Sequence, residues 1–114
     1  MNSPITTHVL DISIGRPAQG VAVILQTQAS GAEWKEVARG VTGPDGRLVN
    51  LVSRGKIARG NYRMRFETGA YFAARKAASF HPYIEITFAV SDSADHYHVP
   101  LLVSPYGYTT YRGS

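Results

Sequence analysis

Segments in which apolar and polar positions alternate recur along most of the chain. The clearest of them are residues 7–14, 34–41, 62–66 and 84–90. A period of two places successive side chains on opposite faces and is typical of a β-strand with one face in the core and the other in water. The pattern therefore predicts strands over these ranges, and an antiparallel one at 62–66.

Three further strands and one short segment follow from composition and from turn residues. Residues 21–28 are β-branched and mostly apolar, which predicts a strand covered on both faces. The run Gly43-Pro44-Asp45-Gly46 is a strong turn signal and leads into a short segment at 48–52. Two last strands are expected at 96–103 and 106–112, joined by a Ser-Pro turn.

One segment differs from the rest because it is rich in alanine and poor in β-branched residues. Residues 68–78 are predicted to form a helix of two to three turns, ended by Phe80-His81-Pro82. Seven or eight short strands with regular turns and one short helix predict a mainly β, two-sheet sandwich. At 114 residues, the chain (1–114) is expected to be a single domain.

Composition narrows the classes of function. Hydrophobic residues make up 44% and charged residues 18%, which excludes a disordered chain. The absence of cysteine excludes disulfides and thiolate metal sites. No apolar run is long enough for a membrane span, and no secretory signal precedes the first strand, so we expect a cytoplasmic protein without membrane partners. Arginines gather between Asp45 and Glu67, but a solvated surface explains them better than nucleic-acid binding.

The candidate chemistry is that of histidine. His96 and His98 face the same side of a strand, His8 projects from the first strand, and Arg47 follows a tight turn. A pair of imidazoles can hold a base and a proton donor at neutral pH. A nearby arginine would keep one imidazole neutral or grip an anionic substrate. The scattered carboxylates, serines and glycines fit neither a glycosidase pair, nor a nucleophile elbow, nor a phosphate loop.

These residues also have simpler explanations. His81, followed by proline, is expected to be structural, and Tyr106, Tyr108 and Tyr111 could be ordinary strand aromatics. The histidine pair could bind zinc, although His8 or His81 would have to complete the ligand set. Spacing alone leaves the substrate open.

Four blocks of sequence carry a resemblance to a known family. They are TTHVLD at 6–11, GRPA at 15–18, TGPDGR at 42–47 and HYHVPLLVSPYGYTTYRGS at 96–114. These blocks resemble the 5-hydroxyisourate hydrolases, the transthyretin-related enzymes of purine catabolism. Transthyretin itself, a hormone carrier of the same fold, lacks the Tyr-Arg-Gly-Ser ending and the histidine set, so the resemblance points to the enzyme.

The resemblance implies a fold, an assembly and a reaction. The fold would be a prealbumin-like β-sandwich with a short helix after the fifth strand. The assembly would be a homotetramer, a dimer of dimers, with active sites at the ends of a channel between facing sheets. The reaction would be hydrolysis of the cyclic amide of 5-hydroxyisourate to 2-oxo-4-hydroxy-4-carboxy-5-ureidoimidazoline, on the route from urate to allantoin, without a metal or organic cofactor.

The resemblance also implies roles for residues. It gives His8, Arg47 and His98 as catalytic, and His8, Arg47, Tyr111 and Ser114 as substrate-binding. His96 receives no catalytic role and is read as structural or supporting. In the mechanism we expect, one imidazole takes a proton from the attacking water while Arg47 stabilises charge on oxygen. Which histidine is the base stays open, and the alternatives are a non-enzymatic binding protein on a transthyretin scaffold and a zinc-dependent hydrolase.

Overall fold

The computed structural model describes residues 3–28, 33–53 and 57–114. In these ranges the chain forms nine strands and one short helix. In chain order they are β1 (Ile5–Asp11), β2 (Arg16–Pro17), β3 (Ala22–Gln28), β4 (Trp34–Val41), β5 (Arg47–Leu48), β6 (Gly60–Phe66), α1 (Thr68–Ala74), β7 (Ile84–Val90), β8 (Tyr97–Ser104) and β9 (Gly107–Thr110).

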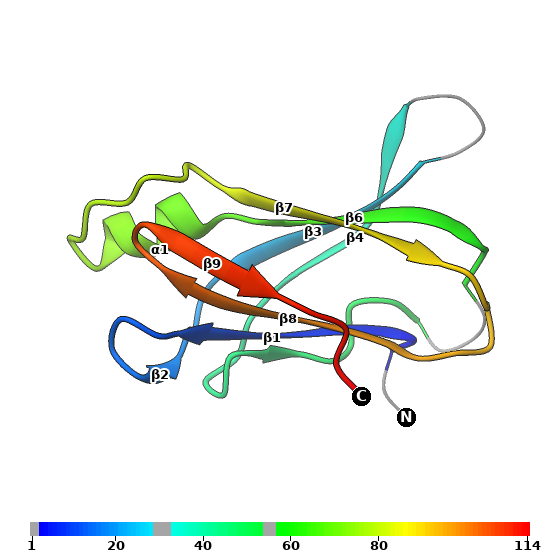
Figure 1. The fold of residues 1–114 in the computed structure, drawn as a ribbon, viewed down its shortest axis with the longest axis horizontal. Helices are drawn as coiled ribbons and strands as arrows, with labels where there is room; N and C mark the ends of the chain where they lie inside the picture. The colour runs from blue at the N-terminus through cyan, green and yellow to red at the C-terminus, as the bar shows by residue number, and fades with distance from the viewer. Residues whose placement is uncertain (1–2, 29–32, 54–56) are drawn as a thin grey trace.

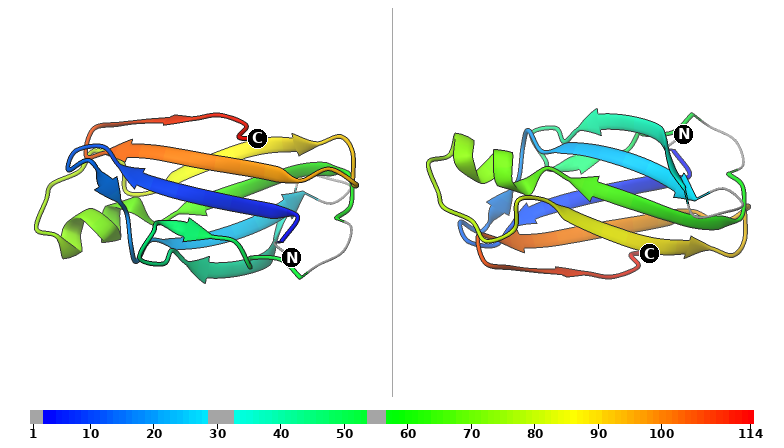
Figure 2. Two further views of the ribbon diagram at one scale, coloured as in Figure 1. Left: turned by 90° about the horizontal axis from the view of Figure 1, so that it is seen from below. Right: turned by 90° about the horizontal axis from the view of Figure 1, so that it is seen from above.

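The strands form two sheets that lie one over the other, which confirms the predicted sandwich. One sheet has the order β2-β1-β8-β9, with β5 also paired to β1, and the other has the order β4-β3-β6-β7. Figure 1 shows the two layers, and Figure 2 shows them from opposite sides, with α1 at one end of the sandwich. Strands β1 and β8 run parallel over seven residue pairs, so an early strand and a late strand lie side by side in the middle of their sheet.

The core fills the space between the sheets. Alternate residues of β1 and β8 point inward, as Val9 and Leu101 do, and meet inward residues of β3 and β6, such as Leu25 and Phe66. These four side chains are fully buried. Burying such a side chain contributes about 1.5–3 kcal/mol, so this alternation stabilises the sheet whose outward face carries the histidines.

The first strand is shorter than its alternation predicts. Instead of continuing to residue 14, β1 ends at Asp11, whose carboxylate accepts a hydrogen bond from the Ser13 amide at 3.0 Å. The Tyr71 hydroxyl of α1 donates to the same buried carboxylate at 2.8 Å. Asp11 therefore turns the chain and ties the helix to the sheet, and Ile12, 55% exposed, lies outside the core.

The helix is also shorter than predicted, because it ends at Ala74 rather than near residue 78. The amide of Ala77 donates to the carbonyl of Phe72 at 2.9 Å, and the amide of Lys76 donates to the carbonyl of Ala73 at 3.0 Å. These two bonds form a Schellman motif, and Lys76 has the left-handed conformation (φ 59°) that glycine usually occupies there. Nothing in the sequence marks the stop, because a lysine replaces the glycine signal.

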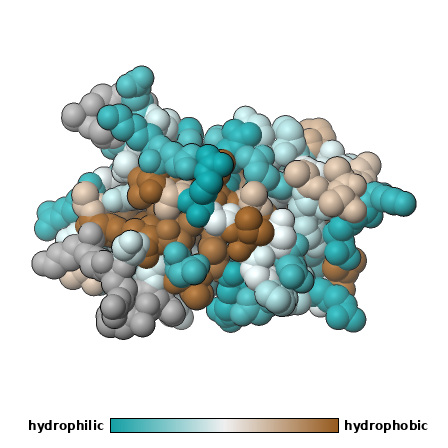
Figure 3. Space-filling view, turned by 180° about the vertical axis from the view of Figure 1, so that it is seen from behind, coloured by the Kyte–Doolittle hydropathy of each residue, from teal (hydrophilic) through white to brown (hydrophobic). Residues whose placement is uncertain are grey.

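The remaining differences are small. The segment predicted at 48–52 is reduced to the two-residue strand β5, and the two-residue strand β2, which leaves no periodic pattern in the sequence, brings the count to nine. Strand β3 is fully buried only on its inward face, since Ile24 on the opposite face is half-buried. Seen from behind, hydrophobic side chains gather in the middle of the molecule (Figure 3). The only helix of the described ranges, α1, is too short to cross a membrane.

Candidate active site

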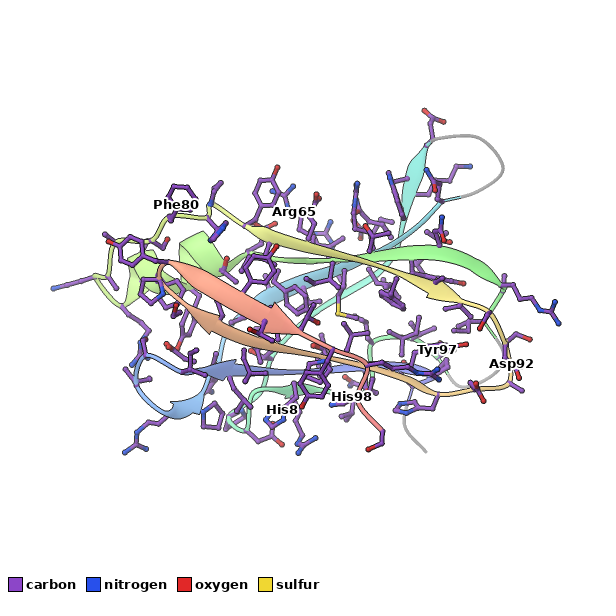
Figure 4. All side chains as sticks on the ribbon, in the orientation of Figure 1. His8, Arg65, Phe80, Asp92, Tyr97 and His98 are labelled. Atoms are coloured by element: carbon purple, nitrogen blue, oxygen red, sulfur yellow. The ribbon has the colours of Figure 1, made fainter. Side chains whose placement is uncertain are left out.

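The candidate site lies on the outward face of β1 and β8. In the parallel register Thr6 is paired with His98 and His8 with Pro100, so these side chains occupy neighbouring rows on the face that points away from the core. His8 and His98 lie close together beside the point where the chain leaves β9 (Figure 4). The sheet thus brings together two histidines that are far apart in the sequence.

His8 is held by the turn that precedes β5. Its Nε2 lies 2.8 Å from the backbone carbonyl oxygen of Asp45, and because a carbonyl only accepts, this nitrogen carries the proton. The other ring nitrogen, Nδ1, is left for a ligand. The register of β1 and β5 pairs His8 with Arg47, so the same turn places the arginine directly beside the histidine.

The geometry of this turn depends on Gly46. Its φ is +78°, which favours glycine, and a Cβ at this position would lie 2.3 Å from the carbonyl oxygen of Val9 in β1. The Asp45 carboxylate accepts a hydrogen bond from the Arg47 amide at 3.0 Å and lies 3.9 Å from the Arg47 guanidinium. The side chain of Arg47 is 49% exposed and that of Asp45 is 66% exposed. Water therefore weakens this ion pair, and the guanidinium stays available to a ligand.

His98 is held from two sides. Its Nδ1 lies 2.8 Å from the Thr6 hydroxyl, which also lies 3.1 Å from Nε2 of His96. On the other side, the amide of Gly113 donates to the carbonyl of His98 at 2.8 Å. The Gly113 backbone lies so close to the His98 ring that a Cβ there would be 2.5 Å from Cδ2. The ring is therefore oriented through Nδ1, and Nε2 is its nitrogen for chemistry.

The surroundings of His98 keep it neutral. Burial is the largest cause that lowers its pKa from the usual 6.5, followed by the positive charge of Arg47 and the neighbouring imidazoles of His96 and His8. At neutral pH this ring is therefore a base able to accept a proton. A group with a perturbed pKa beside a cation, on a surface, is a candidate functional site.

The chain segment after β9 is fixed to the site rather than loose. The Arg112 guanidinium lies 4.4 Å above the Tyr97 ring and 3.6 Å from the Asp95 carboxylate, and it donates to the His96 carbonyl at 3.4 Å. These contacts hold the backbone that presses Gly113 against His98. The tail therefore helps to orient the candidate base.

The predicted site residues are not all in one place. His8, Arg47 and His98 lie together, and Ser114, which is exposed, directly follows Gly113. Tyr111 is 57% exposed and lines a hollow of about 310 Å³ between the tail, β7 and β8. Neither His8, Arg47 nor His98 lines this hollow.

Three contacts were missed by sequence reasoning: the Thr6 hydroxyl, the Asp45 carbonyl and the Gly113 backbone. Alternation along the first strand puts Thr6 on the same face as His8, but it does not show that Thr6 meets His98. The other two act through the backbone, which leaves no signal in side-chain chemistry. Within residues 3–28, 33–53 and 57–114, no group of three or more His, Cys, Asp or Glu side chains could hold a metal ion.

The arrangement combines a neutral imidazole, a second imidazole with a fixed proton and a guanidinium on an open face of the sheet. This set can accept a proton from water and stabilise negative charge on an oxygen of a bound substrate. It can therefore perform hydrolysis with acid–base groups alone.

The chain is similar along nearly its whole length to several known hydrolases. A 5-hydroxyisourate hydrolase from Mus musculus is 43% identical, covering 99% of this chain and 97% of its own length. Another from Halalkalibacterium halodurans is 46% identical, with both chains covered completely. A solved 5-hydroxyisourate hydrolase from Klebsiella pneumoniae has a TM-score of 0.85 at 37% identity, covering 96% of this chain and 98% of its own.

The same fold occurs in a carrier. Sea bream transthyretin, solved in complex with thyroxine, has a TM-score of 0.92 at 32% identity, covering 97% of this chain and 95% of its own. The sequence model of the family described as HIUase/Transthyretin matches residues 5–113. The chain therefore belongs to the HIUase/Transthyretin family.

Proposed function

We propose that this protein hydrolyses the cyclic amide of 5-hydroxyisourate, as the names of its relatives say of them. The observation that carries the proposal is the meeting of His8, Arg47 and His98 on one outward face. A carrier needs only a complementary surface. A neutral imidazole held beside a guanidinium is what a hydrolytic reaction requires.

In the proposed mechanism His98 is the general base. Its pKa is lowered by burial and by Arg47, and its Nδ1 is engaged by Thr6, so Nε2 accepts the proton from water. The hydroxide oxygen bonds to the ring carbonyl carbon, and Arg47 stabilises the negative charge on the carbonyl oxygen. The carbon–nitrogen bond then breaks, and the nitrogen takes the proton from His98.

The other predicted residues bind the substrate in this proposal. The free Nδ1 of His8 accepts a ring N–H, since Nε2 is committed to the Asp45 carbonyl. Ser114 and Tyr111 contribute polar groups from the tail. Tyr111 would have to turn from its present hollow toward the histidines, so its role has the least support from the geometry.

The proposal includes the assembly. The end strands β7 and β9 have one partner each in their sheets, and such edges need a cover. A homotetramer, a dimer of dimers, would cover them and place the outward face of β1 and β8 in a channel. We also propose that residues 1–114 act as one domain in the cytoplasm. Sedimentation of the purified protein measures the assembly directly.

A spectrophotometric assay tests the activity. Urate oxidase generates 5-hydroxyisourate, and its decay is followed with and without the protein. We expect decay much faster than the spontaneous rate, unchanged by EDTA. Decay at the spontaneous rate would leave the non-enzymatic binding protein as the better account. Loss of activity in EDTA that zinc restores would favour a metal-dependent hydrolase.

A further inference from the structure

A single hydroxyl joins two imidazoles beside the candidate site. The Thr6 oxygen lies 2.8 Å from Nδ1 of His98 and 3.1 Å from Nε2 of His96. In the part of the chain that the structure describes, these two ring nitrogens are the only hydrogen-bond partners of that hydroxyl. Thr6 is 2% exposed, so water has little access to the oxygen that the rings share.

The Thr6 hydroxyl couples the proton positions of the two rings, because it has one proton and donates it to one ring only. If it donates to His96, its oxygen accepts from Nδ1–H of His98, and Nε2 of the neutral His98 ring has a free lone pair. If it donates to His98, the proton of that ring is on Nε2, which then cannot act as a base. The direction of one O–H bond therefore decides whether His98 is basic at Nε2.

We propose that His96 is a positioning residue, which accepts the Thr6 O–H at Nε2 and so keeps His98 in the tautomer with a free Nε2. The inference rests on the proposed hydrolysis, because only a reaction that uses Nε2 of His98 as the base requires this tautomer. His96 acts through Thr6 in this account and does not touch the substrate.

The contrast with His8 shows why a second ring is needed. The Asp45 carbonyl can only accept, so it fixes the proton on Nε2 of His8 without any further group. A hydroxyl can either accept or donate, so Thr6 fixes one tautomer of His98 only when its own proton has another acceptor. Nε2 of His96 is that acceptor.

The surroundings of His96 suit this role. Its side chain is exposed, so Nδ1–H can donate to water while Nε2 accepts from Thr6. The Arg112 guanidinium donates to the His96 carbonyl at 3.4 Å and lies 4.4 Å above the Tyr97 ring, which holds the backbone at the start of β8. The rings of His96 and His98 are nearly parallel, with an interplanar angle of 14° and centroids 6.5 Å apart, and both remain within reach of the one hydroxyl.

Removing the acceptor nitrogen of His96 tests the proposal. His96→Phe keeps a planar ring beside His98 but has no nitrogen, so Nδ1 of His98 becomes the only acceptor for the Thr6 O–H. Leaving that buried donor unpaired is costly, so His98 should pass to the Nε2–H tautomer. We expect kcat to fall by about 5- to 150-fold, the factor that corresponds to one unpaired buried donor, while KM changes little.

Nitrogen-15 NMR reads the tautomer directly, which a simple loss of packing would not change. The full chain is labelled with ¹⁵N-histidine, and its rings are observed at mildly alkaline pH, where imidazole is neutral. We expect the His98 proton on Nδ1 in the wild type and on Nε2 in His96→Phe. His8 should keep its proton on Nε2 in both, so its signal is an internal reference.

Matched variants separate the position of the proton from packing. Thr6→Ser keeps the hydroxyl and should keep the Nδ1–H tautomer of His98. Thr6→Val removes the hydroxyl, so adding His96→Phe to it should lower kcat no further, whereas independent effects would multiply. His81→Phe makes the same replacement at a histidine outside the site and should match the wild type in kcat and in the His98 signal.

A His98 proton on Nε2 in the wild type would overturn the proposal, and so would an unchanged tautomer or an unchanged kcat in His96→Phe. A further loss of kcat on adding His96→Phe to Thr6→Val would overturn it too, since His96 would then act independently of the hydroxyl. The decay of 5-hydroxyisourate tests the proposed function separately. A wild type that does not accelerate this decay would refute the hydrolysis, while the NMR spectra still decide whether His96 sets the tautomer of His98.

Discussion

The contact between Gly113 and His98 allows a sharp test of how the tail serves the site. In Gly113→Ala, the new Cβ would lie 2.5 Å from Cδ2 of the His98 ring, about 0.9 Å short of the nearest ordinary contact of 3.4 Å. Either the ring or the tail must move by roughly this distance. A misplacement of about 1 Å at a reacting group can cost about 10²-fold in rate, so we expect kcat/KM to fall by that order.

The same change should hardly affect stability. The tail is at the surface, and the interaction at risk is the hydrogen bond from the Gly113 amide to the His98 carbonyl. Such a bond contributes about 0.5–1.5 kcal/mol, so the free energy of unfolding should fall by no more than that. The prediction is therefore a large loss of activity with a small loss of stability.

Two measurements check it, the 5-hydroxyisourate decay assay and urea unfolding. Gly107→Ala in β9 is the matched control, because the nearest atom to its Cβ would be 3.9 Å away. The control should keep the activity and stability of the wild type. If Gly113→Ala were as active as Gly107→Ala, the tail would not orient His98 and the reasoning would be wrong.

Three further predictions concern the charge beside the base and two backbone conformations. Arg47→Ala should raise the pKa of His98, because one cause of its lowering is removed, and move the acid limb of residual kcat/KM to higher pH; an NMR titration of the ring checks this independently. Lys76→Gly should raise the free energy of unfolding, measured by urea unfolding, by about 0.5–1 kcal/mol, because the strain of the left-handed lysine exceeds the entropy cost of glycine. The control Arg75→Gly, at a residue with an ordinary φ of −94°, should lower it. Gly46→Ala should lower the melting temperature and the activity together, since its Cβ would collide with β1; unchanged values for both would contradict the role of this turn.

The lowered pKa of His98 also makes the free energy of unfolding depend on pH. Because folding favours the neutral ring, the unfolded chain binds a proton more readily below the usual pKa of 6.5. His98 therefore destabilises the fold as pH falls from that value toward its folded pKa, and has no effect above it.

Much of the fold could be predicted from the sequence because burial on one face imposes a period of two. Strands β3, β4 and β7 coincide with their predicted ranges to within a residue. The ends of β1 and α1 could not be predicted, since both depend on contacts made after folding. Asp11 binds a tyrosine from the helix, and Lys76 adopts a conformation that its residue type disfavours.

In the candidate site, too, local patterns predicted some features, and others depend on contacts made only after folding. Alternation placed His8 on a strand and Arg47 followed from the turn before it, but the pattern did not show that the face of His8, which it shares with Leu10, points away from the core. The link from Thr6 to His98 could not be predicted, because it depends on a parallel register between strands far apart in the chain. A local pattern carries no information about which distant strand becomes a neighbour.

The parallel pairing of β1 with β8 also means that the candidate site is completed only late in translation. Thr6 and His98 are 92 residues apart, so closing the loop between them costs about 4 kcal/mol in chain entropy, and at ribosomal speed β8 follows β1 by roughly 5–20 s. Until then, β1 has only the two-residue strands β2 and β5 as partners within its sheet. The half of the candidate site with His8 and Arg47 is therefore translated early, while His98, the proposed base, arrives late. A nascent chain that stops before β8 would carry the arginine and one imidazole on an unfinished sheet, so hydrolysis would begin only after translation is almost complete.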